Sequence, residues 1–139
     1  MSDLISMESD RVLAQLAAYP QIAAPQYAAA AEGALLILTA DMAQYPAQHS
    51  TTYHRTGTLG RTWYAAQPEW HYQADQFQAS ARNPTPYAAF VQGAADQAWM
   101  HAGHWRTDQQ IMAARRRDIE GRFRTAADTI AHQINEVTA

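Results

Sequence analysis

The chain of 139 residues carries a formal charge of −3 at pH 7 and contains no cysteine, which excludes disulfides and thiolate metal sites. Its composition, 47% hydrophobic and 17% charged, is that of one folded domain, because a disordered chain would be less hydrophobic or more highly charged. The slight acidity also argues against a dedicated nucleic-acid-binding domain, which is usually basic.

All ten basic residues are arginine and none is lysine. A GC-rich genome would produce this bias alone, but arginine also makes planar, bidentate contacts that suit interfaces. We expect no signal peptide, since the N-terminus lacks a basic segment followed by an apolar core. The most apolar run, 34–38, is far shorter than the roughly 20 residues of a membrane span, so no membrane contact is expected.

Residues 1–46 are predicted to form a helical N-terminal part made of two helices. Apolar residues lie roughly along one stripe in 3–19, and Pro20 is expected to end that first helix. Pro25 suits the first turn of a second helix, whose apolar residues recur at spacings of three and four up to Tyr45. Because apolar residues also widen this stripe, we expect the second helix to pack against the sheet and against either the first helix or another subunit.

Residues 53–93 are predicted to form the sheet, which begins where helical spacing of the apolar residues gives way to alternation. Gly57 marks this change and is the natural position for a positive backbone φ, which residues with a Cβ adopt less easily. The alternation from Thr58 onward predicts the first strand.

Two more alternating segments extend the predicted sheet. In 70–81 the alternation changes phase at Asp75-Gln76, which indicates either a bulge or a turn. Residues 87–92 carry apolar side chains on both faces, as a central or covered strand does, and Gly93 is expected at the turn that follows.

The best-specified element is a long C-terminal helix, 106–137. Thr107 and Gln110 fit a capping box at its start, and its apolar stripe continues to Val137. An unbroken helix of this length is about 45 Å long, whereas a compact domain of this size is about 37 Å across. Unless it stops or bends near Gly121, we expect the helix to overhang its own core and to pack on another subunit.

Together these patterns predict an α+β fold in a single domain, 1–139. Its small antiparallel sheet of three to four strands is expected to be packed by two N-terminal helices and one long C-terminal helix.

Four motifs occur in a recognisable order: Tyr45-Pro46, Arg55 to Trp63, Pro86 to Gly93, and Trp105 before the last helix. In this order they resemble the minor virion proteins of long-tailed bacteriophages that complete the tail or join it to the head. In that family a helix ends in a Tyr-Pro step, and strands of the form R-T-G-x-L-x-x-[ST]-W and P-Y-A-x-[FY]-V-x-G follow. A Trp-containing loop and a long helix complete the pattern, so the resemblance spans most of the chain.

The resemblance implies a structural role in the virion rather than catalysis. It implies a homo-oligomeric ring at the head–tail neck or the tail end, sixfold because tail tubes are sixfold. The implied partners are other copies of the chain, connector or head-completion proteins and tail-tube proteins, with DNA only as passing cargo. The protein would be made in the bacterial host cytoplasm and would need no cofactor.

Aromatic and arginine residues gather around these motifs, and such residues dominate binding hot spots. For most of the aromatic residues the alternative to an interface role is packing in the core or on the face of the sheet. We expect turns at Gly57 and Gly93, and a subunit or partner interface formed by Arg55, Arg61, Trp63, Tyr64, Tyr87, Phe90, Gln92, Trp99, Trp105 and Arg106.

No catalytic motif is present: the sequence has no G-x-S-x-G elbow, Walker loop or G-x-G-x-x-G. The main alternative function is a small-molecule binding domain or enzyme that uses the Trp/His loop, 97–107. Within that loop His101 and His104, with Asp96 nearby, suggest a metal site, but zinc usually takes three or four protein ligands. A third alternative is a nucleic-acid-binding module that uses the arginines of the last helix, although Arg115-Arg116-Arg117 point in three directions, as a solvated face does.

Overall fold

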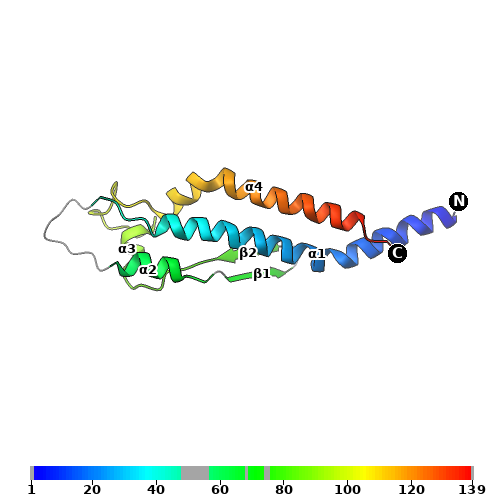
Figure 1. Cartoon of the computed structure of the whole chain (residues 1–139), viewed down its shortest axis with the longest axis horizontal. Coiled ribbons are helices and arrows are strands. Elements are labelled where there is room, and N and C mark those ends of the chain that lie inside the picture. The colour runs from blue at the N-terminus through cyan, green and yellow to red at the C-terminus, as the bar shows by residue number, and fades with distance from the viewer. Residues whose placement is uncertain (1, 48–56, 68, 74–75, 139) are drawn as a thin grey trace.

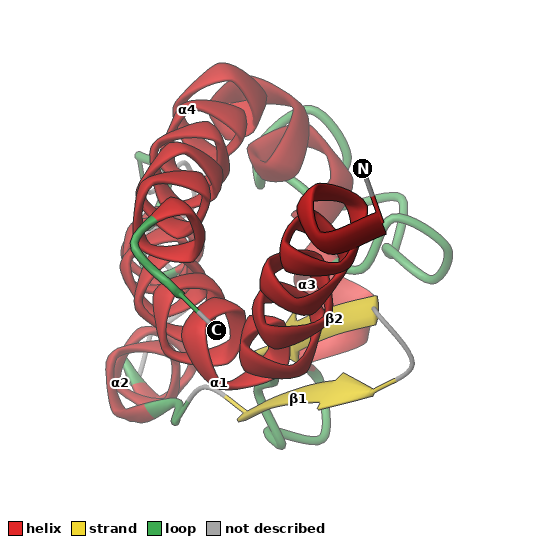
Figure 2. Cartoon of the chain, turned by 90° about the vertical axis from the view of Figure 1, so that its right-hand side faces the viewer, coloured by secondary structure: helices red, strands yellow, loops and turns green. Residues whose placement is uncertain are grey.

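Two long helices that lie side by side form the body of the molecule (Figure 1). The computed structural model describes residues 2–47, 57–67, 69–73 and 76–138. Its elements, in chain order, are α1 (Ser2–Met42), α2 (Thr58–Ala65), β1 (Glu69–Gln73), β2 (Gln76–Ser80), α3 (Ala88–Gln92) and α4 (Asp108–Asn135). Figure 2 looks at the end where both termini lie and shows the two strands on one side of the long helices.

The expected α+β fold with three to four strands is wrong, because the described residues are mostly helical and contain one two-stranded sheet. The strands β1 and β2 pair antiparallel, with Trp70 opposite Ala79 and Gln73 opposite Gln76. The phase change in the alternation therefore separates two paired strands, which excludes a bulge within one strand. The residues between them, 74–75, lie outside the described part of the chain.

The first predicted strand is instead the helix α2. Gly57 does adopt the expected positive φ, 78°, but it stands at the N-terminal cap of a helix. Leu59 and Trp63 are four residues apart, a spacing that fits one helical face as well as one strand face over so short a segment. The Thr62 hydroxyl donates to the Thr58 carbonyl, 2.8 Å away, as helical threonines do.

The last predicted strand, 87–92, is also helical and forms α3. Its buried residues are Val91 and Gln92, which are neighbours on the end of the helix that faces α1. Gly93 follows in an extended conformation, φ −77°, and a Cβ there would lie 2.7 Å from the Ala89 carbonyl oxygen. Glycine is required at this turn by close backbone contact rather than by a positive φ.

The two predicted N-terminal helices are one continuous helix, since Pro20 and Pro25 both lie inside α1. A proline in a helix interior removes one backbone hydrogen bond and costs about 3 kcal/mol, which is why the sequence predicts an end there. Packing reverses that preference: Ala23, between the two prolines, is completely buried. In Figure 1 the helix slopes one way in its cyan part and the other way in its dark-blue part, as expected for a proline-kinked helix.

The start of α4 is formed as the sequence predicts. Thr107 Oγ1 accepts from the Gln110 amide at 3.2 Å, and Gln110 Oε1 accepts from the Thr107 amide at 2.9 Å, which completes the capping box. The helix continues through Gly121 without interruption to Asn135.

The expected overhang belongs to α1 rather than to α4. Arg11 Nη2 donates to the carbonyl oxygen of Asn135, 3.1 Å away, so the end of α4 lies beside Arg11. The residues of α1 before Arg11 extend beyond α4, as Figure 1 shows. The last helix thus packs along its own chain, and the free helical end is the N-terminal one.

The core is the seam between the two long helices. Small side chains of α1 face bulkier ones of α4, which lets the helices approach closely. The buried apolar residues of this seam and its ends include Ala23, Ala31, Ala34, Met42, Ile111, Ala126 and Ile130.

Candidate interaction surfaces

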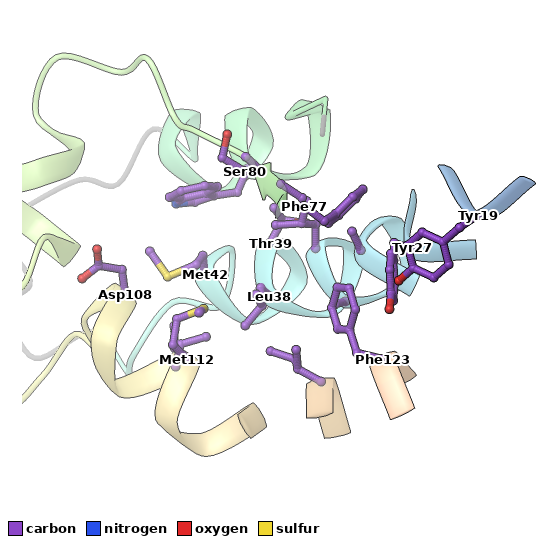
Figure 3. A pocket seen from close by; sticks show the side chains of 18 residues that line it. Tyr19, Tyr27, Leu38, Thr39, Met42, Phe77, Ser80, Asp108, Met112 and Phe123 are labelled. Carbon is purple, nitrogen blue, oxygen red and sulfur yellow. The ribbon is translucent and has the colours of Figure 1, made fainter. Parts of the chain in front are cut away.

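An apolar groove of about 640 Å³ lies between α1, α4 and β2 (Figure 3). Leu38 and Met42 of α1, Met112 and Phe123 of α4, and Phe77 of β2 are among its walls. The groove is partly open to solvent, since Met112 is half exposed whereas Ala34 and Ile111 are buried. Its polar residues are Tyr19, Tyr27, Thr39, Trp63, Ser80 and Asp108. An open hollow with such walls suits an apolar occupant.

A cluster of aromatic rings closes one stretch of the groove. Phe77 lies 5.9 Å from Tyr27 and 6.3 Å from Phe123, measured between ring centroids, and Tyr27 lies 6.1 Å from Phe123. Trp70 of β1 stacks on Phe77 from the other side at 5.6 Å. These contacts attach the β-hairpin to both long helices. A hydrogen bond with Tyr19, together with burial, raises the pKa of the Tyr27 phenol.

Trp63 and Gln92, two of the predicted interface residues, form a cross-link inside the molecule. Trp63 Nε1 donates to Gln92 Oε1 at 3.0 Å, and Gln92 Nε2 donates to the Met42 carbonyl at 2.9 Å. Gln92 is 2% exposed. The Met42 carbonyl is one of the last four carbonyls of α1, which have no amide partner within the helix. The Gln92 side chain therefore supplies a hydrogen-bond donor to this carbonyl and at the same time binds Trp63 of α2.

Tyr45 and Trp105 form a second cross-link near the same end. The Tyr45 hydroxyl accepts from the Gly60 amide at 3.0 Å, and its ring lies 5.0 Å from the Trp105 ring. Close contact explains the glycine, since a Cβ at Gly60 would lie 3.0 Å from the Tyr45 ring. The Tyr-Pro step, the R-T-G-x-L segment and the Trp-containing loop are thereby brought together.

The remaining arginines of the predicted interface lie in different places. Arg106 Nη2 lies 3.8 Å from Asp41 Oδ2, and Arg115 binds the same carboxylate in a bidentate manner at 2.6 and 3.0 Å. The hydrogen bond from Arg115 is the main reason why the pKa of Asp41 is lowered. Arg61 is exposed at the surface of α2, and Arg55 lies outside the described residues.

Arg115 was not recognised as a structural residue from the sequence. Arg115 is followed directly by Arg116 and Arg117, and three consecutive arginines in a helix usually face solvent. Asp41 lies 74 positions earlier in the chain, so no local sequence pattern connects it to Arg115. The contact ties the start of α4 to the end of α1.

The other predicted aromatic residues are exposed. Trp99 is 84% exposed, and Phe90, Tyr87 and Met100 are also largely exposed. They lie in or next to α3 and its following loop, which are joined by a hydrogen bond from the Ala98 amide to the Phe90 carbonyl at 2.7 Å. We call these four residues the aromatic end surface. Tyr64 of α2 is exposed as well, and its hydroxyl accepts from Gln44 Nε2 at 3.2 Å.

A second apolar surface lies at the opposite end, on the first part of α1. Val12, Leu13 and Leu16 are each more than half exposed. The sequence places Leu13 and Leu16 on one apolar stripe, but it does not reveal that this stripe is left uncovered.

The Trp/His loop, 97–107, is held in place by hydrogen bonds and an aromatic contact, and it does not form a wall of the apolar groove. Gln97 Nε2 donates to the Val91 and Trp105 carbonyls at 2.8 and 3.0 Å, and the His101 ring meets Trp105 edge-on. No residue of 97–107 lines the apolar groove. Among the described residues there is also no group of three His, Asp or Glu side chains that could hold a metal ion.

By length and composition alone, Asp10–Met42 of α1 could cross a membrane. This stretch is not apparent from the sequence when a helix end is predicted at Pro20, because the structure continues α1 through that residue. Core helices of water-soluble proteins pass the same criterion, and here Ala23, Ala31 and Ala34 of this stretch are buried within the protein.

Comparison with protein-family models, with curated proteins and with solved structures finds no match.

Proposed function

We propose that this chain is a structural subunit of a long-tailed bacteriophage virion and forms a ring at the head–tail interface or the tail end. The observation that carries this proposal is the apolar surface left uncovered at two places on the described part of the chain. Leu13 and Leu16 of α1 are 63% and 65% exposed, and Phe90 and Trp99 near α3 are 57% and 84% exposed. Exposed apolar surface of this kind marks sites where protein partners bind.

The position of the open apolar surface supports assembly rather than binding of one small ligand. The aromatic end surface and the exposed part of α1 lie at opposite ends of the molecule, and the apolar groove runs between them. Two different surfaces on one subunit are what a head-to-tail ring requires, because each copy must offer one surface to each neighbour.

The four motif segments meet at one end of α1, although the two that resemble strands of the tail-completion and head–tail joining proteins are the helices α2 and α3 here. Tyr45, Trp63 and Trp105 belong to the motifs, and Gln92 stands at a variable position within one of them; together they hold α2, α3 and the following loop on the end of α1. The motif residues therefore build the end that carries the exposed Trp99 and Phe90. In the proposed ring, this aromatic end surface contacts a tail-tube or connector protein, and no substrate is transformed.

The test is the mass of the full chain in solution, alone and mixed with the tail-tube and connector proteins of the same phage. We expect light scattering to give a multiple of 15.5 kDa, or a stable complex with one of those proteins. Electron cryomicroscopy of purified particles would then locate the ring. A chain that remains a monomer under all these conditions, and is missing from the neck and tail of the particle, contradicts the proposal.

A further inference from the structure

We propose that the open edge of β1 pairs with the same edge of a second copy of the chain, so that the two hairpins join into one antiparallel sheet. The occupant of this edge is the strand Glu69–Gln73 of the second copy. Such a contact is two-fold and differs from the head-to-tail contact of the proposed ring, so the inference goes beyond the proposed function.

The backbone groups of Trp70 point away from β2. Two residues separate the strands in the sequence, and in a hairpin of this kind the flanking pair, Gln73 and Gln76, exchanges backbone hydrogen bonds. Hydrogen-bonded and non-hydrogen-bonded pairs alternate from there, so Trp70 and Ala79 form a non-hydrogen-bonded pair. No described residue binds the backbone amide or carbonyl of Trp70, and the same alternation turns the backbone groups of Tyr72 outward.

The strand β1 is the outer one of the two. Figure 2 shows β2 next to the long helices and β1 on the side away from them. Phe77 holds β2 against the helices through its ring contacts. In β1, Glu69 and His71 are exposed, and Trp70 is 47% exposed. The outer edge of β1 is therefore accessible to an extended segment of another chain.

This edge also lacks the features that usually protect an edge strand. Unpaired backbone groups attract other strands, and natural proteins prevent this with lysine, proline or a bulge. All five residues of β1 pair with β2 without a bulge, the strand contains no proline, and the whole chain contains no lysine. A two-stranded hairpin is by itself marginally stable, so additional strands would stabilise this one.

The edge is complementary to itself. When two copies of β1 run antiparallel with His71 opposite His71, Trp70 of each copy pairs with Tyr72 of the other. Both pairs then exchange the backbone hydrogen bonds that each hairpin leaves unused. A shift by one residue would turn these groups away from each other, and a shift by two would leave one such pair within the strands. Glu69, the one charged residue of β1 at neutral pH, lies opposite position 73, so no like charges meet.

The long helices leave room for this pairing. The two-fold axis is perpendicular to the joined sheet, so the helices of both copies lie on the same face. Neighbouring strands are about 4.8 Å apart, which places the two copies of β2 about 14 Å apart. The helix α1 runs along β2 and is about 10 Å across, so two copies of α1 fit side by side.

The experiment uses single cysteines on the outer face of the hairpin, since the chain has none of its own. The test variant is His71→Cys, and the controls are Glu69→Cys and Gln78→Cys, all at exposed positions. In the proposed pair the two Cα atoms of residue 71 are about 4.5 Å apart, within reach of a disulfide. The two copies of residue 69, and likewise of residue 78, are about 14 Å apart.

Under mild oxidation of the full chain, we expect His71→Cys to form a disulfide-linked dimer several-fold faster than either control. Circular dichroism checks that each variant is folded. Equal rates in the three variants would overturn the pairing, because exposed thiols that meet by chance react alike. A faster reaction of Glu69→Cys would also overturn it, because that result requires a different register.

A charge exchange tests the same contact without a covalent bond. His71→Glu and His71→Lys each bring like charges together at the two-fold axis, and each should raise the dissociation constant of the dimer about fivefold. Gln78→Glu adds a charge to the same face away from the axis and should leave the constant unchanged. A mixture of His71→Glu and His71→Lys should pair more tightly than either variant alone, measured by light scattering over a range of concentrations. Failure of the mixture to do so would overturn the pairing.

The outcomes also separate this inference from the proposed ring. A head-to-tail ring does not need the edge of β1. Rings that form while His71→Cys cross-links no faster than its controls would therefore overturn the pairing alone. Pairing through His71 in a chain that is missing from the purified particle would overturn the ring alone.

Discussion

Replacing Gln92 by Met should separate the role of the buried amide from that of its volume. Methionine has a similar length and keeps the packing, but it removes the acceptor of Trp63 Nε1 and the donor to the Met42 carbonyl. Gln92 is 2% exposed, so water cannot replace the amide at the Met42 carbonyl. Leaving one such buried group without a partner costs about 1–3 kcal/mol.

The indole of Trp63 is only partly buried, and water can restore some of its hydrogen bonding. We therefore expect Gln92→Met to lower the free energy of unfolding by about 2–3 kcal/mol in total. For a chain of this length that corresponds to a fall in Tm of roughly 6–15 °C. Urea and thermal unfolding should be measured at several protein concentrations, so that a contribution from subunit association is separated from the stability of the single chain.

A double-mutant cycle with Trp63→Phe tests the pairing itself. If Trp63 and Gln92 interact, the double variant should lose less stability than the sum of the losses of the two single variants. The difference, which is the coupling energy, should be at least about 0.5 kcal/mol. Gln109→Met, at an exposed position of α4, is the matched control and should change stability by less than about 0.5 kcal/mol. A Gln92→Met protein as stable as this control would refute the reasoning.

Four further predictions concern single residues. Because the pKa of Asp41 is lowered in the folded protein, its contribution to stability is present above the ordinary aspartate pKa of about 3.9 and is lost as the pH falls through the lower folded value. The free energy of unfolding should therefore fall less steeply with decreasing pH in Asp41→Asn than in the unmodified chain. An unchanged pH profile would contradict the role of Arg115. Gly57→Ala should cost about 1 kcal/mol in thermal unfolding, because alanine is strained at φ 78°, and a neutral result would contradict that backbone. Thr107→Ala should cost about 1 kcal/mol through loss of the capping box, whereas Thr107→Ser should recover most of it. Trp99→Ala should leave the Tm of the single chain unchanged but weaken binding to the tail-tube or connector protein, measured in a pull-down. A lower Tm would instead show that Trp99 stabilises the folded chain.

The elements that were predicted correctly are those specified by local sequence. Thr107 and Gln110 are three residues apart, and the contact that starts α4 is made within one helical turn. The left-handed conformation of Gly57 is likewise a property of one residue and was read from the sequence alone.

The errors arose where distant contacts override a local preference. Pro20 ends helices in most contexts, yet the burial of Ala23 against the body of the protein keeps α1 continuous. Thr58 to Ala65 is too short for apolar alternation to distinguish a strand from a helix, and the cross-link from Trp63 to Gln92 favours the helix. The groove could not be predicted at all, because its walls come from segments separated by dozens of residues.

The prolines of α1 have a consequence for how the first part of that helix is oriented. Proline has no amide hydrogen, so the carbonyls of Leu16 and Gln21, four residues before Pro20 and Pro25, have no donor in the usual helical position. The backbone ladder is thus thinned where the first part of α1 leaves the packed body, and small changes in the direction of that part disturb few hydrogen bonds. In the proposed ring, the angle between neighbouring copies would then follow the contact made at the first part of α1 rather than the stiffness of the helix.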